Sequence, residues 1–352
     1  MNAFLFEARI PRVVFGAGAL QHLVREIDAM GSTRALVLST PEQSADAERV
    51  AGILGSRAVG VFPRATMHVP IELAREARLE ASRLGADCAV AIGGGSTTGL
   101  GKAIALESGL PILSIPTTYA GSEMTPIYGV TDNGVKQTGR DARVLPRTVI
   151  YDPELTLGLP IRMTVSSGLN AIAHAAESLY AHDGNPVIGL MAEEGIRAIG
   201  AALTPLQANP ADLVARSDAL YGAWLCGAVL GAVSMGLHHK LCHTLGGAFN
   251  LPHAELHTVI LPHALAYNSA RASQAMERIA RALGVSSAPR GLFDLAERSG
   301  LPVSLAALGM PREGIELAAD MAVKNPYPNP RPLERDAIRV LLEHAYDGVR
   351  PS

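Results

Sequence analysis

The sequence predicts an α/β amino-terminal domain with a Rossmann-like, mostly parallel sheet, followed by an all-helical carboxyl-terminal domain. The 352 residues exceed what one hydrophobic core usually serves. Up to about Asp152, short β-branched runs alternate with helical stretches, whereas beyond residue 154 apolar residues recur every three or four positions. We therefore expect two domains, residues 1–153 and residues 154–352.

The first half reads as a series of strand–helix–strand units. The expected strands are "RALVLST" (34–40), "AVGVFP" (58–63), "CAVAIGGG" (88–95) and "PILSIPTT" (111–118). The expected helices are "SADAERVAGILG" (44–55), "PIELAREARLEASRLG" (70–85) and "TTGLGKAIALESG" (97–109). Because a helix joins each strand to the next, the strands should pair in parallel with helices on both faces of the sheet.

The second half shows helical spacing almost throughout. The expected helices lie in residues 163–182, 187–206, 212–233, 234–247 and 274–284. The boundary near "YDPELTLGLP" (151–160) is a turn region without a low-complexity linker. We therefore expect the two domains to abut and to leave a cleft between them.

Composition excludes several classes of protein. Hydrophobic residues make up 48% of the chain and charged residues 18%, as in an ordinary packed globular protein. The net charge of -3 lacks the basic footprint of a nucleic-acid-binding protein. Three scattered cysteines form neither a disulfide framework nor a C-x-x-C pair, which indicates a reducing compartment. There is no basic leader and no apolar run of ~18 residues, so we predict a cytoplasmic protein without a membrane span.

A glycine-rich segment, "AIGGGSTTGLGKAIAL" (91–106), follows an expected strand and opens a helix. Glycines at such a place let backbone N–H groups approach a diphosphate, and the helix N-terminus adds partial positive charge. Gly93, Gly94, Gly95 and Ser96 are therefore candidate dinucleotide-binding residues. The segment is not G-x-G-x-x-G, and the alternative is a tight turn that binds nothing.

Other strand ends carry glycine or hydroxyl groups that suit the same cofactor. These further candidates are Gly16, Ser39, Thr117, Thr118, Ser122 and Lys136. Ligands of such sheets bind at the carboxyl ends of the strands, although Ser, Thr and Gly also build ordinary loops and Lys136 suits a solvated surface. The strand ending at Ser39 and Thr40 has no acidic residue to exclude a 2′-phosphate, so both NADH and NADPH are permitted.

A second candidate site is a group of histidines in "MGLHHKLCHTLGGAFNLPH" (235–253). His239 and His243 are spaced i, i+4 and share one face of a helix. That spacing suits two metal ligands, and it equally suits two donors aimed at an anionic substrate. The alternative is that they are buried core histidines without a function. The candidates in this segment are His239, Lys240, His243 and His253.

A third segment, "GLNAIAHAAE" (168–177), adds polar residues at helical spacing. Asn170 and His174 are one turn apart, and Glu177 follows one turn later. These residues join the histidines in one site if the two segments meet, and otherwise they support helix packing.

The order of "GGGSTTGLGK", "PTTYAGSE", "GLNAIAH", "HKLCHTLG" and "PH" resembles the iron-containing alcohol dehydrogenase family over nearly the whole chain. The resemblance implies the fold shared with dehydroquinate synthase, a nicotinamide cofactor and a divalent metal bound by an Asp and three His. The corresponding positions are Asn170, His174, His239 and His253, and His243 corresponds to a histidine beside the nicotinamide. Asn170 stands where the family has its metal-binding Asp. Gly99 stands where the family's glycine-rich helix usually carries an Asp near the nicotinamide ribose.

These departures, together with "PTTYAGSEMTPIYGVTD" (116–132) and "NPYPNPRP" (325–332), resemble the branch that reduces maleylacetate to 3-oxoadipate in the breakdown of aromatic compounds. The implied substrate is a dianion whose carbon–carbon double bond is conjugated to a ketone. An amide is a weaker metal ligand than a carboxylate and does not repel a dianion, so we expect an anion site without a metal.

The expected roles follow from the resemblance. His243 is the first choice for a donor or general acid, and His174, His239 and His253 would hold the ketone oxygen or a carboxylate. Lys240 binds a carboxylate or is a surface charge. Three other functions remain open: a metal-dependent alcohol dehydrogenase, a lyase related to dehydroquinate synthase, and a nucleotide-sensing protein.

We also expect a homodimer, from the resemblance and from the alternating segment "AFLFEARIPRVVFG" (3–16). Such alternation suits an edge strand that would otherwise be exposed.

Overall fold

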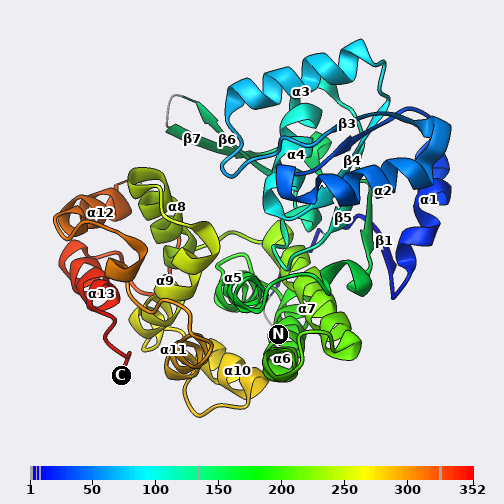
Figure 1. Cartoon of the computed structure of the whole chain (residues 1–352). Coiled ribbons are helices and arrows are strands. Elements are labelled where there is room, and N and C mark those ends of the chain that lie inside the picture. Colours follow the sequence, from blue (N-terminus) through cyan, green and yellow to red (C-terminus); the bar gives the residue numbers. More distant parts are fainter. Residues whose placement is uncertain (1–2, 5, 8, 133–134, 325–326) are drawn as a thin grey trace. The chain divides into compact units, whose positions relative to one another are not determined.

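The computed structural model describes residues 3–4, 6–7, 9–132, 135–324 and 327–352 (Figure 1). The chain divides into two compact units, one of Ala8–Leu159 and one of Met1–Glu7 with Pro160–Ser352. This boundary lies a few residues later than the one expected at 153/154. Directly after β8 (Thr148–Tyr151), Asp152 accepts the backbone N–H of Glu154 and starts a short 3-10 helix, Pro153–Thr156, which continues the first unit.

The first unit contains a six-stranded sheet in the order β1-β8-β5-β4-β2-β3, and all of its strand pairs are parallel. Besides β8, its strands are β1 (Arg12–Phe15), β2 (Ala35–Leu38), β3 (Ala58–Phe62), β4 (Cys88–Gly93) and β5 (Ile112–Pro116). The predicted parallel α/β class is confirmed. The sequence analysis did not predict β8.

Helices cover both faces of this sheet. They are α1 (Leu23–Ala29), α2 (Ser44–Leu54), α3 (Ile71–Arg83) and α4 (Gly95–Ser108). Val37 on β2 packs in a core with residues of α1 and α2, whereas the adjacent Leu36 and Leu38 pack with residues of α3 and α4. Successive side chains of a strand point to opposite faces, so β2 supplies both cores.

An antiparallel hairpin, β6 (Ile127–Asp132) and β7 (Val135–Arg140), follows β5. The sequence analysis did not predict this hairpin and placed Lys136 among the strand-end candidates. The hairpin is attached to the segment before α3, where Thr131 donates its hydroxyl to the carbonyl of His68 at 2.8 Å.

A buried lysine fixes the loop between β5 and β6. Lys102 on α4 is 1% exposed, and its ammonium donates to the carbonyls of Ser122 (2.6 Å), Thr125 (2.8 Å) and Ile127 (2.7 Å) and to the hydroxyl of Thr125 (2.9 Å). Burial lowers the pKa of Lys102 to about 7, although the negative charge of Glu123 acts to raise it. Four oxygen acceptors favour the ammonium, since it donates three hydrogens and a neutral amine only two.

The second unit is helical, as predicted. Its helices are α5 (Ile161–Ser178), α6 (Pro186–Ala208), α7 (Leu213–Ala232), α8 (Leu237–Phe249), α9 (His253–Asn268), α10 (Ser273–Leu283), α11 (Ala288–Arg298), α12 (Gly314–Val323) and α13 (Arg335–Asp347). Two hydrophobic cores organise them. Ile172 of α5 belongs to the first core and Leu241 of α8 to the second. Helix α9 contributes to both, through Leu265 and Ile260.

In the described part of the chain, no single helix has both the length and the apolar composition that crossing a membrane requires. Only α7 and α8 taken together meet these criteria, and the two helices are bent by 94° at the break between them.

Replacing Lys102 by methionine should lower the free energy of unfolding by about 3 kcal/mol or more, because three buried carbonyls lose their donor. Guanidinium denaturation measures the effect. Lys324→Met is the matched control, since Lys324 is exposed and its loss should change stability by no more than about 0.5 kcal/mol. Equal stability of the two variants would contradict the assigned role of Lys102.

Candidate active site

The carboxyl ends of four strands of the parallel sheet bring most of the predicted cofactor residues to one edge of the sheet. Gly16 follows β1, Ser39 follows β2, Gly93 ends β4, and Thr117 follows β5. Parallel strands run in the same direction, so these ends share an edge. That edge is where α/β sheets bind their ligands.

The glycine-rich turn is packed too closely by its neighbours to hold side chains at Gly93 and Gly94. Gly93 has φ +147°, and a Cβ there would lie 2.5 Å from the Thr97 hydroxyl and 2.8 Å from Oε1 of Gln43. A Cβ on Gly94 would lie 3.0 Å from Thr118. Gly94 begins α4 without a side-chain cap, so the first backbone N–H groups of the helix remain available for an anion.

Thr117 and Thr97 complete this edge. Gln43 donates from Nε2 to the Thr117 hydroxyl at 2.9 Å, and Thr117 donates its backbone N–H to the carbonyl of Gly93 at 3.1 Å. The Thr97 hydroxyl is buried and has no hydrogen-bond partner among the described residues. An uncapped helix start, closely approached glycines and an unsatisfied hydroxyl fit a phosphate-bearing cofactor.

The turn after β1 is fixed by a carboxylate. Gly16 has φ +143° and donates its N–H to the carbonyl of Tyr151 at 3.0 Å. Asp152 accepts the backbone N–H groups of Gly18 and Leu20, each at 3.0 Å. The glycine turn is therefore tied to the end of β8.

The remaining predicted cofactor residues have different surroundings. Ser39 is buried and donates its hydroxyl to the carbonyl of Thr40 at 3.0 Å. The carbonyl of Ser122 accepts a hydrogen bond from the Lys102 ammonium. Lys136 lies on β7 of the hairpin and not at a strand end, and burial lowers its pKa. Gly95 and Ser96 are the first residues of α4.

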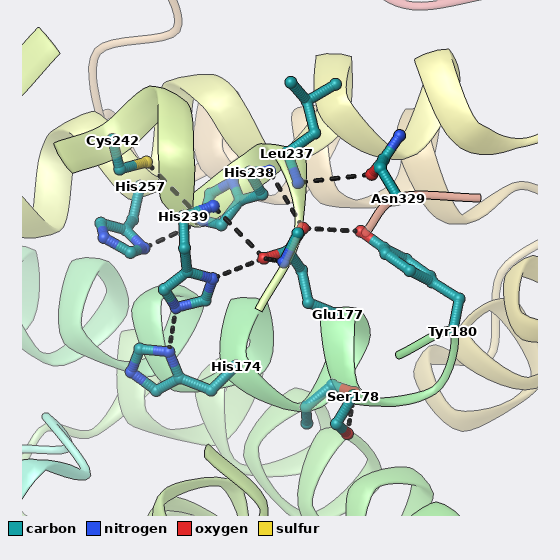
Figure 2. A network of polar contacts seen from close by, with 12 residues as sticks. His174, Glu177, Ser178, Tyr180, Leu237, His238, His239, Cys242, His257 and Asn329 are labelled. Atoms are coloured by element: carbon teal, nitrogen blue, oxygen red, sulfur yellow. Dashed lines mark hydrogen bonds and ion pairs between the residues drawn. The ribbon is translucent and has the colours of Figure 1, made fainter. Parts of the chain in front are cut away.

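The two histidine segments of the helical unit meet. Nδ1 of His174 on α5 lies 2.7 Å from Nε2 of His239 on α8, and Nδ1 of His239 lies 2.7 Å from Oε2 of Glu177. Figure 2 shows His239 held between His174 and Glu177, which are one turn apart on α5. The result is a continuous chain from a carboxylate through two imidazole rings.

Glu177 is fully buried and accepts several further hydrogen bonds. The backbone N–H groups of Gly236 (3.0 Å), His238 (2.9 Å) and His239 (3.2 Å) and the hydroxyl of Tyr180 (3.2 Å) all donate to it. Burial by itself raises the pKa of Glu177, but the hydrogen bond and charge of His239 outweigh it and lower the pKa to about 2. The carboxylate is therefore ionised at neutral pH.

A second, buried histidine pair lies beside this chain. Nε2 of His238 lies 2.9 Å from Nδ1 of His257 and 3.7 Å from Sγ of Cys242, and the three ligand atoms lie within 4.8 Å of one another. Burial, with the charges of His239 and His243, lowers the pKa of His238 to about 3, so its ring is neutral. One proton shared between the two rings accounts for their contact.

The other predicted residues surround this cluster. The rings of His239 and His243 have centroids 6.3 Å apart, and those of His253 and His257 are 4.4 Å apart. Asn170 is buried on α5, one turn before His174. The Lys240 ammonium lies 5.7 Å from the centre of the Tyr327 ring.

The predicted metal positions do not present a ready ligand set. Two nitrogens bound to one tetrahedral zinc ion lie roughly 3.4 Å apart, given Zn–N bonds of about 2.0–2.1 Å. His174 and His239 are closer, at 2.7 Å, and a proton between their nitrogens occupies the lone pair that an ion needs. The first position is an amide, Asn170, which supplies no charge. The side chains as they lie do not fit a divalent ion.

Sequence reasoning did not assign several residues of the site. Glu177 was noticed at helical spacing from His174, but its bond to His239 joins segments 62 positions apart. Gln43 and Asp152, which order the strand ends, are single polar residues in turns and gave no signal. Lys102 stands in the quoted glycine-rich motif, and its spacing from Gly95 places it on the helix that opens there.

Comparisons with known proteins agree with this arrangement. The model of the iron-containing alcohol dehydrogenases matches residues 11–153, and that of the Fe-containing alcohol dehydrogenase family, C-terminal, matches residues 164–346. The chain is 56% identical to the maleylacetate reductase of Sphingobium indicum over 348 residues, 99% of each chain.

Solved structures extend the likeness to the backbone. The crystal structure of maleylacetate reductase from Agrobacterium tumefaciens is 54% identical, with a TM-score of 0.96 and full coverage of both chains. That of a proposed alcohol dehydrogenase from Ralstonia eutropha is 63% identical, with a TM-score of 0.99 and full coverage of both chains. Family models over both units and relatives over the whole length lead to one conclusion: the chain belongs to the iron-containing alcohol dehydrogenase family.

Proposed function

We propose that this protein reduces the carbon–carbon double bond of maleylacetate to give 3-oxoadipate, a step in the breakdown of aromatic compounds, with NADH or NADPH as the reductant. The observation that carries the proposal is the buried chain Glu177–His239–His174 where the family places a metal, with Asn170 in place of its carboxylate ligand. The proposal is also supported by the similarity of this chain, over its length, to the maleylacetate reductases from Sphingobium indicum and Agrobacterium tumefaciens.

The reaction takes up one hydride and one proton. A bound nicotinamide supplies the hydride and is oxidised. The hydride adds to the carbon β to the ketone, the double bond is lost, and an enolate forms with its charge on the ketone oxygen. A proton then adds to the carbon α to the ketone and restores the carbonyl. Donors aimed at the oxygen stabilise this enolate, and such electrostatic stabilisation is usually the largest contribution to catalysis.

The first unit supplies the residues that would hold the cofactor. The start of α4, with Gly93, Gly94 and the Thr97 hydroxyl, suits the diphosphate. Thr117 and Thr118 suit the polar groups of the sugar and amide. Ser39 and Thr40 leave the end of β2 without an acidic side chain, so we propose that NADH and NADPH are both accepted.

The histidines of the second unit supply donors. We assign His243 as the donor or general acid, because it corresponds to the family's histidine beside the nicotinamide and is exposed on α8. His174, His239 and His253 would hold the ketone oxygen or a carboxylate. The Lys240 ammonium lies over the Tyr327 ring. We assign Lys240 to binding a carboxylate of the substrate, and the only support is the positive charge that it adds locally.

We propose that the reduction needs no bound metal. The hydrogen bond between His174 and His239 and the uncharged Asn170 support this proposal. The absence of a carboxylate at position 170 also favours binding of the substrate, because a negative side chain there would repel the dianion. The metal-dependent alcohol dehydrogenase is the second candidate, favoured by the three family histidines that the chain retains.

We further propose a cytoplasmic homodimer. The free thiols Cys88, Cys226 and Cys242 suit a reducing compartment. β1 is an edge strand, and exposed apolar side chains on β1 and in the sequence that precedes it suit burial against a second copy. These side chains are Phe4, Phe6, Ile10 and Phe15.

The purified enzyme should oxidise one equivalent of NADH or NADPH for each maleylacetate, followed by the loss of nicotinamide absorbance, and should leave simple aldehydes unreduced. A lyase that uses its dinucleotide transiently would show no net oxidation. A nucleotide-sensing protein would bind NADH without turnover. Either result, or faster turnover of aldehydes, would reject the proposal.

Asn170→Asp should raise the KM for maleylacetate and increase the metal bound after incubation with zinc, because it restores a carboxylate ligand next to a dianion site. Steady-state kinetics and elemental analysis measure both. Asn209→Asp adds the same charge at an exposed position and should change neither. An unchanged or lower KM with higher activity would favour the metal-dependent enzyme.

Light scattering should give the mass of two chains at working concentrations. Because the edge strand and its apolar side chains would be buried, replacing Phe4 and Phe6 by serine should shift the equilibrium towards the single chain. A wild-type protein that scatters as a monomer would exclude the dimer.

A further inference from the structure

We infer that Glu177 is a positioning residue for the reduction: its carboxylate fixes the orientation of His239 with a hydrogen on Nδ1 and, through that ring, the orientation of His174. The inference rests on the proposed function, since it concerns the same histidines. Glu177 touches neither of the candidate donors His243 and His253 in any hydrogen bond described above, so its effect passes through His239.

The donors around Glu177 determine where the protons lie. Glu177 accepts three backbone N–H groups and a tyrosine hydroxyl, and a carboxylate can only accept, so Nδ1 of His239 carries the hydrogen of their 2.7 Å contact. Nε2 of His239 and Nδ1 of His174 lie 2.7 Å apart and share one further hydrogen between them. The hydrogen on Nδ1 of His239 is thus set by Glu177, and the contact with His174 links the second ring to the same carboxylate.

The same carboxylate fixes the backbone that carries His239. Three N–H groups at the start of α8, those of Gly236, His238 and His239, donate to Glu177. A negative charge is favourable at a helix N-terminus. One side chain therefore holds both the helix end and the imidazole ring, and neither can move without breaking a bond to a buried charge.

His174 completes the clamp from the same helix. His174 and Glu177 lie one turn apart on α5, and the ring of His239 bonds to one through Nε2 and to the other through Nδ1 (Figure 2). Buried polar chains of this kind are worth most when every member is satisfied. Removing the carboxylate releases one side of the ring and leaves its tautomer undetermined.

A cavity reaches Glu177 from the other side. It measures about 560 Å³ and is lined by Glu177, Tyr180, Gly236, Arg271 and Asn329, whereas His174 and His239 do not line it. A small carboxylate can therefore enter the space that a shortened side chain at position 177 would leave. This makes chemical rescue by formate a test of the carboxylate itself.

Glu177→Gln should lower kcat with maleylacetate by roughly 10- to 100-fold, the usual effect of removing a carboxylate that orients a functional histidine. The KM for NADH should stay within about twofold, because the cofactor residues belong to the other unit. Tyr180→Phe is the matched control: it removes one bond to Glu177, leaves the bond to His239, and should keep kcat within about twofold. Formate should raise the kcat of Glu177→Ala and leave that of Tyr180→Phe unchanged.

Two readouts do not depend on turnover. The low-field proton resonance of the His239 Nδ1–H should be present in the wild type and in Tyr180→Phe and lost in Glu177→Gln. Thermal unfolding identifies folded variants, and if Glu177→Ala does not fold, Glu177→Gln and the resonance carry the test. Retention of kcat or of the resonance in folded Glu177→Gln would overturn the inference. If maleylacetate is not reduced at all, the proposed function fails while the resonance still tests Glu177.

Discussion

The buried negative charge of Glu177 is the constraint on which the helical unit's site depends. A carboxylate removed from water is costly unless donors surround it, and here the donors are a histidine ring, a tyrosine hydroxyl and the first N–H groups of α8. Because these donors come from α5 and α8, satisfying the charge brings the two helices together. The histidines therefore meet at a defined geometry where the two hydrophobic cores join.

A buried positive charge organises the other unit in a comparable way. Lys102 is buried on α4 and binds the carbonyls of Ser122, Thr125 and Ile127, which lie in the loop after β5 and at the start of β6. Glu123 from that loop is also buried, and the hydroxyl of Tyr151 donates to it at 2.7 Å. In both units a loop or helix end that carries candidate functional groups is thus held by one buried charge, which a surface ion pair would not achieve.

The exchange of a carboxylate for an amide at Asn170 connects these features to the chemistry. A metal site needs negative charge and lone pairs that converge on one point, whereas an anion site needs hydrogens and positive charge. In this chain the rings of His174 and His239 are joined to each other by a shared proton. The family's scaffold is retained, and the proposed reduction uses it for hydrogen-bond donation to an anionic substrate.

The sequence by itself determined the parallel sheet, the helical second unit and the strand ends that carry Gly93 and Thr117, because these depend on local periodicity and on the direction of the chain. It also placed His239 and His243 on one helix face. Only the tertiary structure decided that Glu177 and His174 hold His239 between them, and that Lys102 binds the loop after β5. Those contacts join residues far apart along the chain, and no local pattern encodes which buried charge will find which donor.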